Sequence, residues 1–375
     1  MATCSACQAN RLGRTLCLFT KNYVWRQPST NRYYGSRIQL VKTHAPVTVL
    51  KNDDSVALRV VSRKRGRNIL ERPGVIRPEE MNREQLVQYL KSQIVYDEDG
   101  VLALNKPAGL GVHSQREDLD TADHQWSLLE VLPDLKHQIG EKHLQFVKAP
   151  EKDCSGVTLL AKTPEIAADI DRSLKEARLR QVFTRVFWAV TVGVPSPLSG
   201  LIKVPVTNEV VDDEHQVSPV KDSSKRSYKM RNTRKLLTKY RVISESNQCA
   251  LVELMPLKAY KDQLRVHMTT KLCRILGDHV YSSRIQTILG IPVLIDARNA
   301  MPGTQVLSEE VRHRMNLTSA VIDSIPLHLH CVAMTLPSWK KKEDLIISAP
   351  LPKYFWKTLK LLDIEHPQIS SELFR

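Results

Sequence analysis

His328 and His330 lie two residues apart in the apolar segment 327–336. In an extended strand both side chains project from one face, where two imidazoles could ligate a metal ion. This spacing is more typical of the polar face of a half-buried strand, and we favour that interpretation. Cys273 and Cys331 also lie in apolar stretches, which indicates core positions rather than nucleophiles.

Other motifs with recognisable chemistry are missing from the sequence. It contains no P-loop, GxGxxG, HExxH or paired CxxC pattern. Cys4 and Cys7 form a single CxxC, but no second Cys/His pair stands at zinc-finger distance, so we interpret it as incidental. These observations argue against nucleotide-driven, dinucleotide-dependent and zinc enzymes.

The composition is that of a globular protein, with 375 residues of which 42% are hydrophobic and 25% charged. Seven cysteines without regular spacing argue against a secreted disulfide scaffold. No apolar run reaches the roughly 20 residues of a membrane helix, so we expect no membrane insertion. A net charge of +15 favours an anionic partner such as RNA, DNA or a membrane surface.

Positive charge is concentrated in residues 1–52, which contain eight basic and no acidic side chains. This composition predicts a mitochondrial transit peptide, and therefore a location in the mitochondrial matrix. The alternative is a disordered basic arm that binds RNA directly. The rest of the chain has 47 basic and 40 acidic residues, so we expect any RNA contact there to form a local groove.

The pattern of apolar residues predicts the elements that must position a site. We expect a linker and an N-terminal helix in residues 53–94, then one domain over residues 95–375. Strands are predicted at 101–104, 156–162, 182–194, 250–257 and 327–336. Helices are predicted at 79–91 and 126–132, from 164, over 261–275 and from 352. Because strands and helices do not alternate strictly, we expect an α+β fold with a large, mixed, mostly antiparallel sheet flanked by helices.

Seven segments, in this order and spacing, resemble the RluA-type pseudouridine synthases. The resemblance covers about residues 95–353 and is carried by ALNKPAGLGVHS (103–114), CSGVTLLAKT (154–163), RVFWAVTVG (185–193), QLRVHM (263–268), LGDHVY (276–281), LHLHCVAMTLP (327–337) and APLP (349–352). It implies a pseudouridine synthase fold with a central cleft. It also implies isomerisation of uridine to pseudouridine in RNA, without a metal or cofactor.

The resemblance also implies the catalytic residues, with several departures from the family pattern. The family's catalytic Asp falls on Glu151, its preceding Arg on Ala149, and its active-site Tyr on Phe187. Arg265 matches the family arginine that pairs with the catalytic carboxylate. Two further family residues, an Arg and a His, have become Tyr260 and Asp262; a second nearby carboxylate, Asp153, could replace Glu151 if the loop register differed by two residues.

The chemistry explains why such a site needs few parts. A carboxylate attacks or deprotonates the sugar–base unit, a cation keeps that carboxylate ionised, and an aromatic ring stacks on the flipped base. We assign these roles to Glu151, Arg265 and Phe187, and expect the pKa of Glu151 to be lowered by Arg265. For contacts to RNA phosphates we expect Lys106, Lys148, Lys152, Arg185 and Lys258.

Two functions remain open from the sequence. The first is a mitochondrial RNA pseudouridine synthase that acts on mRNA or rRNA and supports mitochondrial translation. The second is a catalytically impaired protein of the same fold that binds RNA or helps to assemble mitochondrial ribosomes. RNA is the expected partner in both, together with proteins of mitochondrial RNA granules or of ribosome assembly.

Overall fold

The computed structural model describes residues 70, 75–114, 125–211, 214–220, 233–300, 303–341 and 343–369. The predicted transit peptide, the Cys4/Cys7 motif and most of the predicted linker lie outside these residues.

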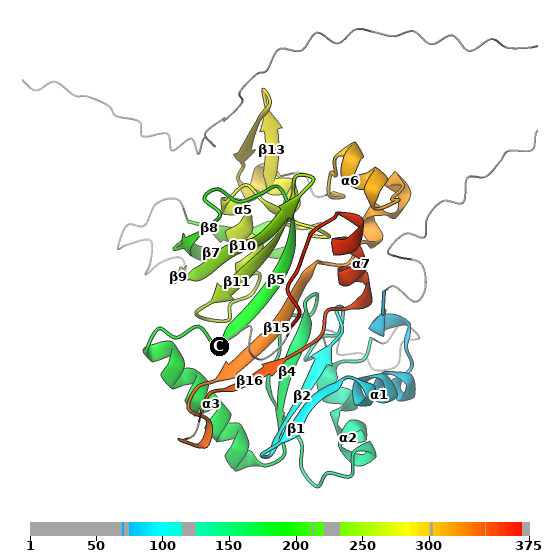
Figure 1. Ribbon diagram of the computed structural model, residues 1–375, viewed down its shortest axis with the longest axis vertical. Coiled ribbons are helices and arrows are strands. Elements are labelled where there is room, and N and C mark those ends of the chain that lie inside the picture. The colour runs from blue at the N-terminus through cyan, green and yellow to red at the C-terminus, as the bar shows by residue number, and fades with distance from the viewer. Residues whose placement is uncertain are drawn as a thin grey trace, which may run out of the picture. The chain divides into compact units, whose positions relative to one another are not determined.

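One large sheet organises the fold, as Figure 1 shows. Its strands run in the order β1 (Ile94–Glu98), β2 (Val101–Lys106), β4 (Ser155–Ala161), β15 (Leu329–Leu336), β5 (Arg185–Val192), β11 (Cys249–Pro256), β10 (Thr238–Ser246) and β6 (Ser199–Ile202). Three short strands pair with β4, β5 and β15: β3 (Gln145–Lys148), β12 (Arg274–Ile275) and β16 (Leu345–Ser348). The β4–β15 pair is parallel and the other pairs are antiparallel, so the predicted mixed, mostly antiparallel sheet is confirmed.

Strand β5 lies in the middle of this sheet and is buried on both faces. Phe187 and Ala189 belong to one hydrophobic cluster, while Val186, Trp188 and Val190 belong to another. The period of two therefore separates the two faces, as the sequence predicted. The first cluster includes residues of α3 (Pro164–Leu179) and α5 (Gln263–Thr270); the second includes residues of α6 (Glu309–Arg314) and α7 (Lys353–Leu361).

A third hydrophobic cluster joins α1 (Arg83–Ser92) and α2 (Leu128–Gln138) to β2 and β4. Both helices begin with a capping box, formed by Asn82 with Gln85 and by Ser127 with Glu130. Helix α2 extends beyond the predicted 126–132 and contains Pro133.

Helix α5 is shorter than the predicted helix over 261–275. It ends at Thr270, and Leu272 adopts a positive φ of 58° that reverses the chain. The residues that follow form β12, whose Arg274 and Ile275 pair with β5. Pairing with the end of β5 therefore overrides the local helical pattern.

Several elements were not predicted from the sequence. A three-stranded sheet contains β7 (Pro205–Val211), β8 (Glu214–Pro219) and β9 (Arg234–Lys235), and β13 (Ile285–Ile288) forms a hairpin with β14 (Ile291–Leu294). Short 3₁₀ helices cover Pro78–Glu80, Ser282–Arg284, Ala297–Asn299, Ser319–Ser324 and Trp339–Lys341. In the part of the chain that the structure describes, no helix has the length and apolar character needed to cross a membrane.

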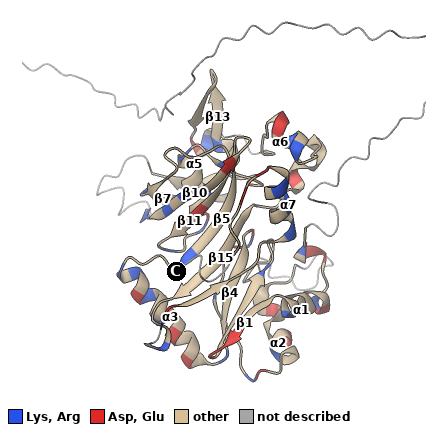
Figure 2. Cartoon of the chain, in the orientation of Figure 1, with Lys and Arg blue, Asp and Glu red and all other residues tan. Residues whose placement is uncertain are grey.

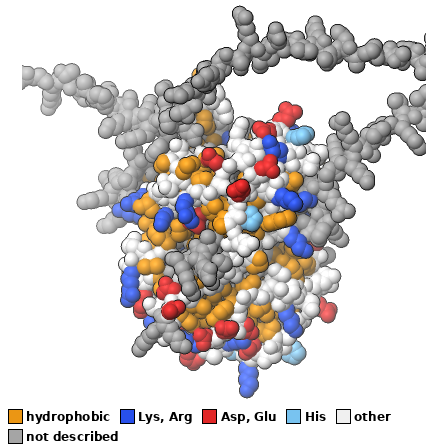
Figure 3. All heavy atoms as spheres, in the orientation of Figure 1, with side chains coloured by type: hydrophobic (Ala, Val, Ile, Leu, Met, Phe, Trp, Pro, Cys, Tyr) orange, Lys and Arg blue, Asp and Glu red, His pale blue; other side chains and the backbone are white. Residues whose placement is uncertain are grey.

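Charge is mixed over the surface rather than gathered into one broad field. Figure 2 shows Lys/Arg and Asp/Glu together on α1, α2, α3 and α6. On the face drawn in Figure 3, basic and acidic side chains are likewise interspersed.

Candidate active site

A cavity of about 160 Å³ lies where the β3–β4 loop, the start of β5, the end of β11 and the segment before α5 meet. It is lined by Glu151, Cys154, Arg185, Phe187, Lys258 and Tyr260, among others. Pockets that enclose drug-sized ligands have volumes of roughly 300–1,000 Å³. This cavity is smaller and suits a single ring, such as one nucleobase. It brings together four of the residues singled out from the sequence: Glu151, Phe187, Arg185 and Lys258.

Glu151 is held in this cavity by the main chain of Asp262. The backbone N–H of Asp262 donates to both carboxylate oxygens of Glu151, at 3.0 Å each. Asp262 immediately precedes α5 and adopts a left-handed conformation with φ 55°. Asp tolerates this conformation better than most residues, which helps to aim the N–H at the loop.

Lys106 fixes the loop that carries Glu151. Its side chain is 1% exposed, and its ammonium donates to the carbonyls of Pro107, Leu110 and Lys152 at 3.1, 2.8 and 3.1 Å. Burial lowers the pKa of Lys106 to about 8, although Cys154, Asp153 and Glu151 oppose the shift. The three carbonyls enclose the Lys106 ammonium, which favours a structural role in the loop over the predicted contact to RNA.

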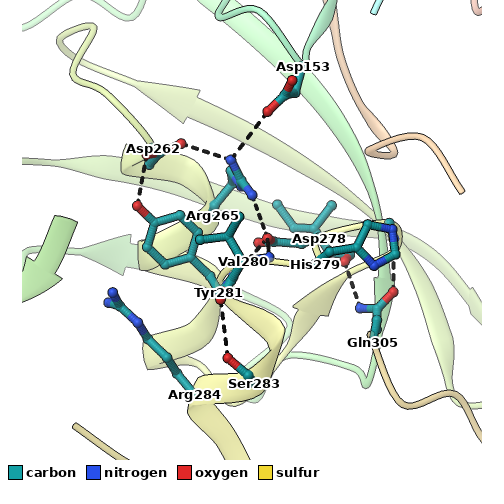
Figure 4. A network of polar contacts seen from close by, with 12 residues as sticks. Asp153, Asp262, Arg265, Asp278, His279, Val280, Tyr281, Ser283, Arg284 and Gln305 are labelled. Atoms are coloured by element: carbon teal, nitrogen blue, oxygen red, sulfur yellow. Dashed lines mark hydrogen bonds and ion pairs between the residues drawn. The ribbon is translucent and has the colours of Figure 1, made fainter. Parts of the chain in front are cut away.

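Arg265 organises a buried network behind the cavity (Figure 4). Its guanidinium donates to Asp262 at 2.9 Å and to Asp278 at 2.6 Å, and Asp153 lies 3.7 Å away. Tyr281 completes the network, because its hydroxyl donates to the second carboxylate oxygen of Asp262 at 2.8 Å and its ring faces the Arg265 guanidinium at 4.9 Å. The Asp262 side chain is thereby held on the side of Arg265 and Tyr281 while its N–H holds Glu151.

The predicted ion pair between Glu151 and Arg265 is not formed. Among the described residues, the ion-pair partners of Arg265 are Asp153, Asp262 and Asp278. Asp262 occupies the position where the family resemblance places a His, and its carboxylate competes for the arginine. Arg265 therefore acts on Glu151 through Asp262, as a positioning residue rather than as a direct partner.

The predicted lowering of the Glu151 pKa is also wrong. Desolvation and the nearby negative charge of Asp262 raise the pKa of Glu151 to about 7, against opposing contributions from the Asp262 N–H and Arg265. The residue as a whole remains solvent-exposed, so desolvation is moderated by water. The upward direction does not depend on desolvation alone, because a second carboxylate close by also disfavours ionisation.

Phe187 supplies an aromatic wall to the cavity. Its side chain is only 4% exposed and packs into the core, yet it lines the cavity together with Leu264 and Leu329. An apolar wall with one ring can receive a planar base and exclude water from it. The Arg185 guanidinium lies 5.9 Å from the centre of this ring.

The remaining basic residues predicted to bind RNA lie in different environments. Lys258 is exposed at the cavity rim, and Lys148 is half-buried at the end of β3. Lys152 is half-buried and donates to the side-chain oxygen of Gln125 at 2.8 Å.

The two histidines considered as metal ligands are fully buried rather than on a polar strand face. The ring nitrogens of His328 contact the Pro326 carbonyl and the Thr358 hydroxyl, at 2.8 Å each. Those of His330 contact the Ser155 hydroxyl at 2.8 Å and the Ala349 carbonyl at 3.3 Å. Neither imidazole has a nitrogen left for a metal, and the described residues contain no cluster of three or more His, Cys, Asp or Glu that could hold one.

Cys273 and Cys331 are buried free cysteines in the main hydrophobic cluster, as predicted. Burial raises the pKa of each thiol to about 12, which keeps the thiols protonated and unreactive.

The sequence analysis missed the roles of Asp262, Asp278 and Tyr281. Asp262 stands where the family has a His, so the sequence indicates only a departure from the family at this position. Its contact to Glu151 is made by the backbone N–H, which the residue type does not predict. Asp278 and Tyr281 both lie in the LGDHVY segment, which was noted only for its resemblance. A buried carboxylate and a buried Tyr within that motif could have indicated a polar network.

The cavity therefore combines a carboxylate, an aromatic wall and basic side chains in a space of single-ring size. Residues 100–270 match the family model for RNA pseudouridylate synthase. The chain is 36% identical over 290 residues to a Homo sapiens mitochondrial mRNA pseudouridine synthase, covering 76% of this chain and 80% of that protein. It is 32% identical over 285 residues to a mitochondrial pseudouridylate synthase of Danio rerio, covering 73% and 74%.

Solved structures agree with this assignment. The structure of human RNA pseudouridylate synthase domain-containing protein 4 superimposes with a TM-score of 0.58 at 29% identity, covering 76% of this chain and 97% of that one. The chain therefore belongs to the RNA pseudouridylate synthase family, and its sheet and helices form the pseudouridine synthase fold.

Proposed function

We propose that this chain converts specific uridines to pseudouridines in mitochondrial RNA, with Glu151 as its catalytic carboxylate. The observation that carries the assignment to Glu151 is its position in a base-sized cavity, fixed by two hydrogen bonds from the Asp262 N–H. Asp153 lies outside that lining and faces Arg265 instead.

The reaction breaks the bond between C1′ of the ribose and N1 of uracil and joins C1′ to C5 of the same base. The ionised Glu151 acts on the sugar as nucleophile or as base, while Phe187 holds the detached ring. The hydrogen on C5 leaves as a proton when the new bond is complete. The isomerisation needs no external oxidant, reductant or energy source.

The substrate and compartment follow from the relatives and from the composition of the chain. Two relatives carry the word mitochondrial in their names, and residues 1–52 have the composition of a matrix-directed presequence. We infer that the protein acts in the matrix on mRNA or rRNA and thereby supports mitochondrial translation. Proteins of RNA granules or of ribosome assembly are the partners we expect there.

A second function has one observation in its favour. Besides the Asp-to-Glu change at Glu151, four family positions differ in the cavity and its surroundings, at Ala149, Phe187, Tyr260 and Asp262. Glu151 is also not paired with Arg265. A protein with these changes could bind RNA without modifying it. We favour the enzyme because Glu151 remains inside the cavity.

Chromatography of digested RNA tests the proposal. Mitochondrial RNA that lacks pseudouridine is incubated with the full chain and hydrolysed to nucleosides. The enzyme function predicts a pseudouridine peak that grows with time and is absent with Glu151→Ala. RNA that is bound but unchanged would support the binding function instead.

A further inference from the structure

Arg185 is a buried cation for which the described residues supply neither a hydrogen bond nor an ion pair. Arg185 is the first residue of β5, is 7% exposed and lines the cavity. Within the described ranges, its guanidinium has no hydrogen bond or ion pair, and its ring contact is with Phe187. A buried charge without such a partner is costly, so this position favours an anion supplied from outside the chain.

Lys148 is a second cation near the cavity, because it directly precedes Ala149, which lines the cavity. It ends β3 and is half-buried, and the described part of the chain gives its ammonium no hydrogen bond or ion pair. The pKa of Lys148 is lowered, first by burial and then by the positive charge of Arg185; Arg178 of α3 acts in the same direction, and Asp171 opposes it. Two positive charges that disfavour each other in this way are both stabilised when one anion binds to them.

Other buried basic side chains have hydrogen-bond or ion-pair partners within the protein. Lys106 donates to three carbonyls, and Arg284 donates to the Val217 carbonyl and to the Gln216 side chain at 2.7 and 2.8 Å. Arg265 is paired with three carboxylates. Among the described residues, Lys148 and Arg185 therefore lack the hydrogen bonds and ion pairs that the other buried cations have. Arg185 lacks them at the wall of the cavity.

We propose that Lys148 and Arg185 form a receptor for one phosphodiester of the RNA, next to the nucleotide whose base enters the cavity. This assignment rests on the proposed function, because it places the phosphate relative to that base. A phosphodiester offers a full negative charge and two free oxygens, which match the guanidinium fork and the ammonium. A uracil carbonyl carries no net charge and could satisfy only one of the two cations.

Salt-dependent binding of the full chain to a single-stranded, uridine-containing RNA tests the receptor. Lys148→Met and Arg185→Met are compared with Lys175→Met, an exposed position on α3 with the same change of charge. We expect each of the first two to weaken binding on the order of tenfold. Each should also reduce the slope of log affinity against log salt by about 0.7, the value for one phosphate contact on a single strand. Unchanged slopes in both variants would overturn the proposal.

Chemical labelling of the wild-type chain provides a second test that needs no substitution at a buried position. An amine-reactive acylating reagent is applied, and modification of Lys148 is followed by mass spectrometry. Uridine 5′-monophosphate should slow this modification several-fold, whereas uridine should not. Equal protection by uridine would contradict a phosphate receptor.

The failure of this receptor can be told apart from the failure of the proposed function. Pseudouridine formation by the wild-type chain, with unchanged salt slopes in both variants, would overturn the receptor and leave the enzyme function intact. Reduced slopes, with protection by the nucleotide and no pseudouridine formed, would support a phosphate receptor on a protein that only binds RNA.

Discussion

The backbone N–H of Asp262 holds both carboxylate oxygens of Glu151 at 3.0 Å, while the Asp262 side chain is bound by Arg265 and Tyr281. One residue thus joins the buried ionic network to the carboxylate in the cavity. Its N–H positions Glu151, and its negative charge makes Glu151 harder to ionise. This linkage yields the predictions for activity and for stability that follow.

The pH dependence of activity should reflect this linkage. Because the pKa of Glu151 is raised to about 7, and the reaction needs the ionised carboxylate, the rate should increase as pH rises through 7. Asp262→Asn keeps the backbone N–H and an acceptor for Arg265 but removes the negative charge, so the acidic limb should move to lower pH. A limb that stays in place in a folded Asp262→Asn protein would show that the Asp262 charge does not act on Glu151.

Stability should respond to the same group. The folded-state pKa of Glu151 is above its ordinary value of 4.5, so the folded protein binds more protons than the unfolded chain between about pH 4.5 and 7. The free energy of unfolding of the wild type should therefore fall as pH rises through this window, relative to Glu151→Gln. Denaturant unfolding at pH 5 and pH 8 measures the difference. If the two proteins respond equally to pH, the raised pKa is wrong.

The Arg265 network should contribute strongly to stability. Arg265→Met leaves the buried carboxylates of Asp262 and Asp278 without their cation, and removing one partner of a buried pair costs about 3–5 kcal/mol. Arg172→Met is the matched control, because Arg172 forms an exposed ion pair with Asp169 at 2.7 Å. Exposed pairs contribute about 0–1 kcal/mol. Equal midpoints of chemical unfolding for the two variants would contradict the structural role of Arg265.

Lys106 should matter for the active-site loop, because its ammonium binds the carbonyls of that loop. Lys106→Met removes the donor shared by three backbone carbonyls, and unsatisfied buried groups cost about 1–3 kcal/mol. We expect slower pseudouridine formation with an unchanged salt slope of RNA binding. Lys142→Met, at an exposed position, is the control. A reduced salt slope in Lys106→Met would instead indicate a direct phosphate contact.

The sequence predicted the parts of the fold in which local pattern and tertiary packing agree. The strand predicted at 182–194 contains β5, and the helix predicted from 164 is α3, which begins at Pro164. The extent of α5 could not be predicted, because pairing of Arg274 and Ile275 with β5 decides where the helix ends. The polar and basic strands β7 to β9 carry too little apolar periodicity to be recognised.

Several residues of the candidate site could be predicted from the sequence, but their hydrogen-bond partners could not. Glu151, Phe187 and Arg185, which the motifs assigned to one site, line one cavity, because Glu151 follows β3 and β5 carries both Arg185 and Phe187. The partner of Glu151 could not be inferred, since the contact comes from a main-chain N–H set by the left-handed conformation of Asp262. Likewise, the sequence around Lys106 is typical of an exposed turn. The carbonyl partners of Lys106 could not be predicted, because they come together only in the folded loop.

The measurement that tests the central claim most directly is release of tritium from RNA labelled at C5 of uridine, since joining C5 to C1′ must expel that hydrogen. We predict release by the wild type and loss of release to background with Glu151→Gln. Asp153→Asn should retain release, because Asp153 is exposed, lies outside the cavity lining and contacts Arg265 only at 3.7 Å. Release that survives in Glu151→Gln but disappears in Asp153→Asn would contradict the assignment of Glu151 as the catalytic carboxylate.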